Sequence, residues 1–443
     1  MIRKISTNLN AFEIYTIIKN FDESYILDSS TNDEASRYSF MSARPFDSIK
    51  LKNNKDSFNI LKDKLSKYKI ETEDKKFPLI SGAVGYLSYN LKDIIEKKLS
   101  NKAINDIDMY DMYLNFYDWT IIYDNQNKET YIATYEICKD SKENIECIVK
   151  LIENAKKPDL KIKEIQKTLL KSNFKKEEYV EAIERIREYI KAGDVYQVNM
   201  TQRFEGETNM DSYDLYNRLR TLSPAPFGAF LNFEDINILS NSPERFIKMQ
   251  DRKIDTRPIK GTRPRGNDEI EDLRYKEELL NSEKDKAELL MIVDLERNDL
   301  GKVSKIGSVK VEELFKLEEY TNVNHLVAKI TSILDEDKDE VDLIKASFPG
   351  GSITGAPKIR AMDIIEELEM LQRNIYTGSI GYIDFSGDLD LNIAIRTLIK
   401  KDNKVYYQVG GGITWDSNPY EEYEESIQKG KSIKRALNGK ITI

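Results

Sequence analysis

The sequence is almost devoid of histidine and cysteine. Among 443 residues there is one histidine, His325, and there are two cysteines, Cys138 and Cys147. A histidine-based zinc centre is therefore excluded, and a serine–histidine or cysteine–histidine catalytic centre would have to use His325 itself. The cysteines do not form a C-x-x-C pair, so neither a zinc site nor a disulfide scaffold is predicted. Any bound metal is expected to have oxygen ligands, which favours Mg²⁺, Mn²⁺ or Ca²⁺.

Long apolar segments are missing as well. No apolar run reaches the roughly 18 residues of a membrane-spanning helix, and the start of the chain shows no apolar core followed by a cleavage site. The formal net charge of −9 argues against nucleic acid or an anionic membrane surface as the main partner. We therefore expect a cytoplasmic protein without a nucleic-acid or membrane partner. Its composition is that of an ordinary soluble globular chain.

The periodicity of apolar residues divides the chain into three parts. Residues 1–153 show short strands rich in tyrosine and isoleucine, including a hairpin within 119–136. Residues 154–172 are lysine-rich and polar, and are predicted to be a linker or surface excursion. Residues 173–443 mix both element types. Helices are predicted from 173 to Gly193 and near 284–297, 357–370 and 419–437, and strands near 194–204, 323–333, 378–385, 390–399 and 404–410. This mixture favours an α+β fold with antiparallel strand pairs.

The segment RPIKGTRPRG, residues 257–266, places Lys260 among three arginines. Taken alone, such a segment is more typical of a solvated basic turn. The alternative is an amine whose pKa is lowered by neighbouring cations or by burial, because both disfavour the charged form. A lysine that is partly unprotonated can act as a nucleophile or a base.

Two acidic helices are candidates for metal binding. Glu422, Glu425 and Lys429 share one stripe of the last predicted helix, beside apolar positions. Glu288 lies next to an apolar run in the helix near 284–297. A half-buried carboxylate needs a partner, and that partner is either an arginine or a metal shared with Glu425.

Several glycine-rich segments could approach an anionic ligand. FPGGSITGAPK (348–358) opens onto a helix without the spacing of a Walker A loop, and it is either an anion cradle or a structural turn. The glycines in YQVGGGITW (407–415) end a strand and allow close backbone approach. Arg396 is predicted within an apolar strand, where it would require a carboxylate from the protein or from a substrate.

Together these segments resemble the chorismate-utilising enzymes. The resemblance extends from about Phe174 to Leu437, and the N-terminal third resembles the amine-forming members more loosely. Its motifs, in order, are AGDVYQVNMTQRF, SPERF, PIKGTRPRG, DLERNDLGKV, FPGGSITGAPK, YTGSIGYI, AIRT and GGGITWDSNPYEEYEES. The resemblance implies two antiparallel β-sheets packed as a sandwich, flanked by helices, with the active site in a central cleft.

Two positions distinguish members of this family by product. Gln197 occupies the place where water-adding members carry a lysine, so isochorismate or salicylate formation is not expected. Lys260 occupies the place where members that aminate C4 carry lysine and members that aminate C2 usually carry alanine. The resemblance therefore implies amination of chorismate at C4, giving 4-amino-4-deoxychorismate for 4-aminobenzoate and folate synthesis.

The resemblance also implies roles for individual residues. Lys260 would be the covalent nucleophile at C2, Glu244 the general acid for the C4 hydroxyl, and His325 an orienting residue. Substrate binding would fall to Thr262, Tyr376, Arg396, Gly410, Gly412 and Lys429. Mg²⁺ would be held by Glu288 and Glu425, with Glu422 acting through water.

The resemblance further implies partners and a second pocket. Ammonia is expected from a separate glutamine amidotransferase subunit, because no such segment is visible in the chain. SYILDSS (24–30) resembles a stretch that helps form a tryptophan pocket in the C2-aminating members. Asp28-Ser29 replaces Glu-Ser there, so we expect a structural pocket.

Two alternatives remain open from the sequence. One is the enzyme of the same family that aminates C2 and makes anthranilate. The other is a noncatalytic subunit that senses chorismate or an aromatic amino acid.

Overall fold

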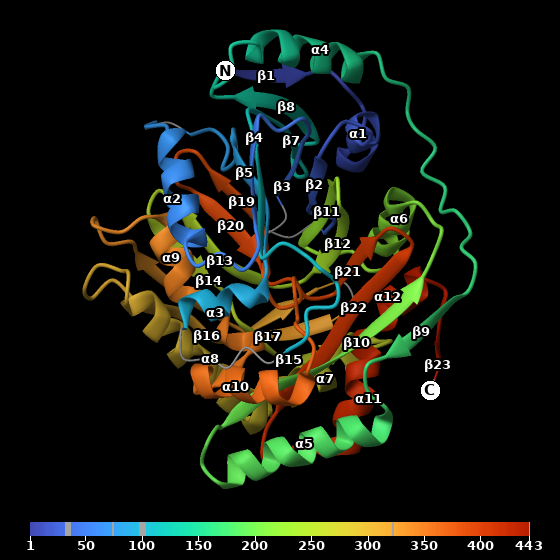
Figure 1. Ribbon diagram of the computed structural model, residues 1–443, viewed down its shortest axis with the longest axis vertical. Coiled ribbons are helices and arrows are strands. Elements are labelled where there is room, and N and C mark those ends of the chain that lie inside the picture. The colour runs from blue at the N-terminus through green and yellow to red at the C-terminus, as the bar shows by residue number, and fades with distance from the viewer. Residues whose placement is uncertain (32–36, 73–74, 97–102, 321–322, 443) are drawn as a thin grey trace.

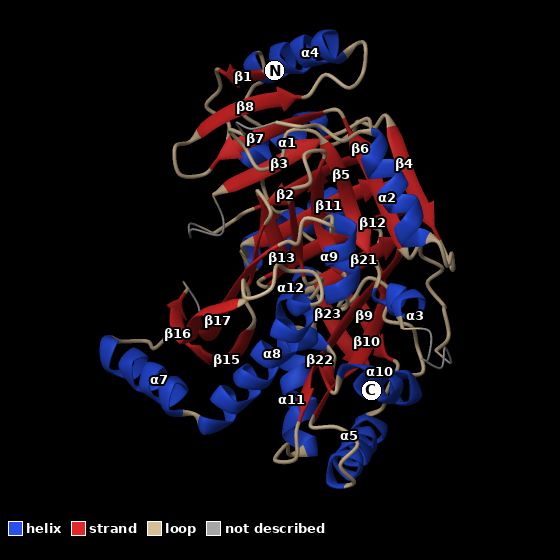
Figure 2. Ribbon diagram, turned by 90° about the vertical axis from the view of Figure 1, so that its left-hand side faces the viewer, coloured by secondary structure: helices blue, strands red, loops and turns tan. Residues whose placement is uncertain are grey.

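A computed structural model describes residues 1–31, 37–72, 75–96, 103–320 and 323–442 of the chain. Two large β-sheets form its centre, with helices on their outer faces (Figures 1 and 2). Within the described residues, no helix combines the length and apolar character needed to cross a membrane.

The first sheet has thirteen strands and joins the two ends of the chain. Its order, with bounds, is β1 (Ile2–Ile5), β8 (Glu129–Thr134), β7 (Trp119–Asp124), β3 (Tyr38–Ser42), β2 (Ser24–Asp28), β11 (Phe227–Phe233), β12 (Ile236–Ser242), β21 (Thr397–Lys401), β22 (Lys404–Ile413), β10 (Gln197–Glu207), β9 (Thr168–Ser172) and β23 (Gly439–Thr442), with β18 (Gly355–Ala356) on β10. All pairs are antiparallel except β9 with β23, which run parallel.

The second sheet has ten antiparallel strands. Its order is β15 (Ile259–Pro264), β17 (Val323–Ile333), β14 (Lys253–Thr256), β13 (Arg245–Gln250), β20 (Leu389–Asn392), β19 (Ser379–Asp384), β5 (Gly82–Leu87), β6 (Met112–Tyr117) and β4 (Asp47–Leu51), with β16 (Lys310–Glu319) on β17. The predicted class, two antiparallel sheets with flanking helices, is confirmed apart from the one parallel pair.

Helices cover the outer faces of both sheets. They are α1 (Ala11–Ile18), α2 (Ser57–Lys67), α3 (Lys92–Ile95), α4 (Ser141–Glu153), α5 (Lys176–Lys191), α6 (Ser212–Leu222), α7 (Glu269–Asn281), α8 (Glu283–Gly301), α9 (Glu340–Ser347), α10 (Lys358–Glu369), α11 (Pro419–Lys429) and α12 (Lys431–Ala436). Figure 2 shows α7 projecting from the body beside β15 and β16.

The sheets are joined by an aromatic-rich core. This cluster takes Tyr25 and Phe40 from the first sheet, and Tyr86, Tyr113 and Tyr382 from the second. Such side chains bury large apolar areas and account for much of the free energy that holds two sheets face to face. Separate apolar clusters lie between each sheet and its helices.

Local sequence signals explain several element boundaries. Asn418 caps α11, since its side chain accepts from the backbone N–H groups of Tyr420 and Glu421, and Pro419 occupies the first turn. The predicted helix over 419–437 is in fact two helices, which meet at Gly430.

The lysine-rich stretch predicted to link the two parts of the chain is only partly a connector. Its first portion, 154–167, runs along one side of the molecule from α4 to β9 (Figure 1). Its last residues form β9 within the first sheet. Strands from residues 1–153 occur in both sheets. The division at 153 and 173 remains a prediction about sequence organisation.

Candidate active site

All twelve residues predicted to form the site line one cavity of about 580 Å³. The cavity lies where β22 of the first sheet, β15 of the second and helices α8 and α11 come together. The set comprises Glu244, Lys260, Thr262, Glu288, His325, Tyr376, Arg396, Gly410, Gly412, Glu422, Glu425 and Lys429. Residues distant in sequence thus line one cavity. Their individual roles stay predictions.

Lys260 is presented by a bulged strand. The pairing of β15 with β17 shifts between Lys260 and Thr262, with Gly261 at the bulge. Gly261 has φ of +69°, and a Cβ there would lie 2.7 Å from Leu279 Cδ1. Only glycine suits this position, because a side chain would meet both backbone strain and a packed neighbour. The Lys260 amine donates to the Ser352 carbonyl at 3.3 Å.

Burial, rather than the neighbouring arginines, lowers the pKa of Lys260. Lys429 adds a smaller lowering, while Glu288 and Glu244 oppose it. The three arginines of the segment are neutralised by their own carboxylates: Arg257 by Glu318 at 2.9 Å, Arg263 by Glu278 at 2.8 Å and Arg265 by Asp272 at 2.7 Å. The interpretation of this segment as a solvated turn is wrong for Lys260, since its amine faces the cavity.

His325 and Thr262 form a fixed pair on adjacent strands. The Thr262 hydroxyl and His325 Nδ1 are 2.9 Å apart. Burial and the nearby Arg396 lower the pKa of His325 to about 4. The imidazole is therefore neutral at pH 7 and offers hydrogen bonds rather than a charge.

Glu244 has the environment of a carboxylic acid. It is buried in the turn between β12 and β13, and its Oε1 accepts from the Ser352 hydroxyl at 2.8 Å. Burial raises the pKa of Glu244, and the bond from Ser352 and the charge of Lys260 only partly offset this. A carboxyl group with a raised pKa can hold a proton for transfer near neutral pH.

Arg396 does not lie within a strand, contrary to the prediction from its apolar neighbours. Residues 393–396 carry the chain from β20 in the second sheet to β21 in the first, and Arg396 has φ of +50°. Alternation of apolar residues cannot reveal such a crossing, because both flanking strands are buried. Among the described residues, no carboxylate lies within ion-pair distance of Arg396. Its guanidinium and the buried Tyr376 thus face the cavity as donors suited to an anion.

The glycines of β22 allow the last helix to approach the strand. Lys429 donates to the Gly410 carbonyl at 3.1 Å and pairs with Glu425 at 2.8 Å. A Cβ on Gly411 would lie 3.1 Å from Lys429 Nζ and 3.3 Å from Glu422 Oε2. The stripe predicted from helical spacing is confirmed, since Glu422, Glu425 and Lys429 all reach the cavity.

The three glutamates predicted to bind a metal all line the cavity, and each could offer carboxylate oxygens. In the described part of the chain, neither Glu288 nor Glu422 has a cation within ion-pair distance. Burial raises the pKa of both Glu288 and Glu422, whereas for Glu425 the pairing with Lys429 outweighs burial and the pKa is lowered. The same described residues contain no preassembled group of three metal-binding side chains. This arrangement fits Mg²⁺, which typically uses one or two carboxylates together with substrate oxygens and water.

Sequence reasoning missed several residues of the cavity wall. Ser352, Asn199, Lys284 and Gln408 all line it. Ser352 lies in the FPGGSITGAPK loop, and nothing in a single sequence shows that its hydroxyl would meet Glu244. Gln197 is buried behind the wall, with its amide nitrogen 1.8 Å from where a Cβ on Gly412 would stand.

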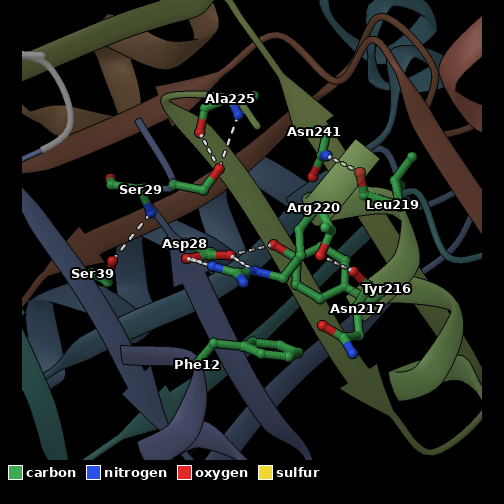
Figure 3. A network of polar contacts seen from close by, with 12 residues as sticks. Phe12, Asp28, Ser29, Ser39, Tyr216, Asn217, Leu219, Arg220, Ala225 and Asn241 are labelled. Atoms are coloured by element: carbon green, nitrogen blue, oxygen red, sulfur yellow. Dashed lines mark hydrogen bonds and ion pairs between the residues drawn. The ribbon is translucent and has the colours of Figure 1, made fainter. Parts of the chain in front are cut away.

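A second cavity, of about 410 Å³, includes Asp28 and Ser29 in its wall. Figure 3 shows the Asp28 carboxylate engaged by its own neighbours. Arg220 Nε donates to Asp28 Oδ2 at 2.6 Å, and the Tyr216 hydroxyl donates to the same oxygen at 3.2 Å. This carboxylate joins α6 to the first sheet, as a structural role requires.

Comparison with known proteins places the chain among enzymes that bind chorismate. A family model described as "chorismate binding enzyme" matches residues 22–435. Anthranilate synthase component 1 of Aquifex aeolicus is 37% identical, with 98% of this chain and 96% of the relative covered. Aminodeoxychorismate synthase component 1 of Salmonella typhimurium is 42% identical, with 82% and 78% covered. The crystal structure of anthranilate synthase component I from Streptococcus pneumoniae matches with a TM-score of 0.80 and 29% identity, over 91% of this chain and 93% of that one. The chain therefore belongs to the chorismate binding enzyme family.

Proposed function

We propose that the chain aminates chorismate at C4 and forms 4-amino-4-deoxychorismate, the reaction of an aminodeoxychorismate synthase component 1. The observation that carries this proposal is Lys260, an amine of lowered pKa that faces the same cavity as the buried acid Glu244. Relatives bearing that name at about 40% identity support it.

The first half of the reaction uses Lys260 and Glu244. The neutral Lys260 amine forms a bond to C2 of the ring, the double bonds shift, and the C4–oxygen bond breaks. Glu244 gives its proton to the departing hydroxyl, which leaves as water. A lysine at C2 blocks that carbon and leaves C4 open to the second nucleophile.

In the second half of the reaction, ammonia displaces Lys260 from the ring. Ammonia forms a bond to C4, the double bonds shift back, and the C2–nitrogen bond to Lys260 breaks. The lysine nitrogen keeps its two protons throughout and leaves as a neutral amine. The one proton in excess, from the ammonia now attached to C4, returns Glu244 to its acid form. The net change is replacement of the C4 hydroxyl by an amino group, with water as the other product.

The remaining cavity residues bind and orient the substrate. Arg396 and Tyr376 would donate to the enolpyruvyl carboxylate, and Lys429 with the Gly410 and Gly412 backbone would complete the anion site. The neutral pair of Thr262 and His325 would contact the region of the ring carboxylate. Glu288 and Glu425, with Glu422 through water, would hold Mg²⁺, which when bound supplies Lewis-acid polarisation of that carboxylate.

Ammonia would come from a separate glutamine amidotransferase subunit. A lyase would then release pyruvate from the product to give 4-aminobenzoate for folate synthesis. The cytoplasm is the proposed location, because these substrates and partners are soluble.

A second candidate is amination at C2, which would give anthranilate. It is supported by the Aquifex aeolicus relative, which matches nearly the whole chain, and by the likeness to the Streptococcus pneumoniae structure. The two candidates differ in whether Lys260 occupies C2 before ammonia arrives.

One turnover experiment separates the candidates. The purified protein is incubated with chorismate, Mg²⁺ and ammonium at alkaline pH, and the product is identified by mass. A product that retains the enolpyruvyl group supports C4 amination, whereas fluorescent anthranilate and free pyruvate support C2 amination. Absence of turnover, even with a glutaminase partner, would instead favour a noncatalytic sensing subunit.

A further inference from the structure

Glu296 meets two other elements at a three-way junction behind the cavity. It lies on α8, and its Oε2 is 3.0 Å from the hydroxyl of Thr256, the last residue of β14. The same hydroxyl donates to the backbone carbonyl of Phe246 on β13 at 2.9 Å. A helix and two strands are thus joined through a single oxygen atom.

The hydrogen-bond count at this junction assigns a proton to Glu296. A threonine hydroxyl has one proton, and the Phe246 carbonyl can only accept. With the Thr256 proton given to that carbonyl, the bond between Thr256 and Glu296 needs a donor on the glutamate. With the anion, Thr256 can donate to Glu296 Oε2 or to the carbonyl but not to both. The acid form of Glu296 is the form in which both contacts are hydrogen bonds at once.

The surroundings of Glu296 disfavour its anion. Its carboxyl lines a cavity of only about 10 Å³, which holds about one water. The nearest lysine, Lys358 on α10, pairs with Asp299 and also donates to the Ser347 and Pro349 carbonyls. Burial, together with Glu244 and Asp299, raises the pKa of Glu296 to about 8, and the opposing effects of Thr256 and Lys358 are smaller.

The three joined elements carry the three groups of the proposed chemistry. Glu296 follows the proposed metal ligand Glu288 by about two turns of α8. Phe246 follows the acid Glu244 by two residues, and Thr256 precedes Lys260 by four. A displacement at the junction would therefore change the spacing of carboxylate, acid and nucleophile at once.

We propose that Glu296, in its acid form, is a positioning residue that holds Glu288, Glu244 and Lys260 in register through Thr256. This inference rests on the proposed function for its catalytic consequence. The hydrogen bond itself does not depend on which carbon is aminated, so chorismate consumption is a sufficient readout.

The test compares Glu296→Gln and Glu296→Ala with the parent protein. Glutamine keeps an N–H donor for Thr256 at every pH, whereas alanine removes the bond. Asp294→Asn is the matched control, because Asp294 lies on the exposed side of the same helix. Glu296→Ala should lower kcat about ten- to hundredfold with KM for chorismate within about twofold, since small misplacements mainly affect the reacting geometry. Glu296→Gln should restore kcat at pH 7.

The decisive measurement is the ratio of parent kcat to that of Glu296→Gln as a function of pH. Ammonia and Lys260 titrate in both proteins, so their effects cancel in the ratio. Ionisation near pH 8 removes the proton from Glu296 in the parent alone, so the ratio should fall about tenfold between pH 7 and pH 9. A ratio that stays constant with pH, or an alanine variant with parental kcat, would overturn the proposal.

A measurement on the resting protein separates this inference from the proposed function. Below pH 8 Glu296 keeps its proton in the folded chain but loses it in the unfolded chain near pH 4.5. The unfolded state then binds fewer protons, so the free energy of unfolding of the parent should fall relative to Glu296→Gln as pH rises from 5 to 8. If no chorismate is consumed but this trend is present, the proposed function fails and the assigned proton stands. If the trend is absent, the proton assignment fails whatever the activity.

Discussion

The acid Glu244 and the amine Lys260 are connected through one residue, Ser352. Its hydroxyl donates to Glu244 Oε1 at 2.8 Å, and its carbonyl accepts from Lys260 Nζ at 3.3 Å. Ser352 belongs to the short 3₁₀ turn Gly351–Ile353 of the glycine-rich loop. The loop thus orients the proposed proton donor and nucleophile together.

Removal of the Ser352 hydroxyl should alter the titration of Glu244. The bond from Ser352 lowers the pKa of Glu244, so Ser352→Ala should raise it and move the corresponding alkaline limb of kcat to higher pH. The maximum kcat should fall about tenfold, because the acid is less well oriented. Ser347→Ala is the control, since its hydroxyl has no hydrogen-bond partner among the residues that the structure describes. An unshifted alkaline limb would contradict the role of Ser352.

Lys260→Ala should abolish formation of the C4-aminated product. The rate of that product should drop at least about 100-fold, since the nucleophile proposed to occupy C2 is removed. Product is identified by mass with ammonium as the nitrogen source. Lys286→Ala, on α8 but outside the cavity wall, serves as the control and should behave as the parent does. Unchanged product and rate would refute covalent participation of Lys260.

Arg396→Met should weaken substrate binding while stabilising the fold. Loss of a charge-assisted contact to a carboxylate, worth about 1.5–3 kcal/mol, should raise KM for chorismate about ten- to hundredfold. Burial lowers the pKa of Arg396, which shows that its charge is disfavoured where it stands. The free energy of unfolding without substrate should therefore rise, on the order of 1 kcal/mol. Denaturant titration checks this second effect, and a destabilised variant would mean that Arg396 has a structural partner.

His325 should make the fold less stable in acid. Its pKa is about 4 in the folded chain, against an ordinary value of 6.5. Between these values the unfolded chain binds more protons, so the free energy of unfolding falls as pH drops from 6.5 to 4. The loss should approach about 3 kcal/mol relative to His325→Gln, which has no such titration. Parallel stability curves for the two proteins would show that the imidazole is not held neutral.

Glu288→Gln should raise the Mg²⁺ concentration needed for activity by at least about tenfold. A neutral amide is a poorer ligand for a hard cation than a carboxylate. Glu283→Gln is the control, because Glu283 is an exposed residue of the same helix. Activity is measured against free Mg²⁺ after treatment with a chelator. An identical Mg²⁺ dependence in both variants would exclude Glu288 as a ligand.

The sequence predicted which residues gather at the cavity more completely than it predicted the path of the chain around them. Helical spacing was enough to bring Glu422, Glu425 and Lys429 together, because residues three and seven positions apart lie on the same face of a helix. The N-cap of α11 at Asn418 likewise depends only on neighbouring residues. The grouping of Lys260, Glu244 and Arg396 came from resemblance, since they lie on separate elements whose packing no periodicity encodes.

What the sequence could not show depends on contacts between distant segments. The arginines beside Lys260 seemed to crowd it, yet Glu318, Glu278 and Asp272 neutralise them from other elements. The crossing at 393–396 was hidden because the strands on either side are both buried and apolar. Ser352 and Glu296 carry hydroxyl and carboxyl groups that are common on protein surfaces, and only their partners single them out.

The two walls of the cavity come from different sheets, and the chain crosses between those sheets at Glu244 and at Arg396. The wall built on β22 and α11 carries the lysine and glycines that suit an anion, whereas the wall built on β15, β17 and α8 carries the nucleophile and its neighbours. The residues that bind the substrate and the residues that react with it can therefore change independently during evolution. Substitutions confined to one wall could direct ammonia to another ring carbon while the affinity for the substrate stays unchanged.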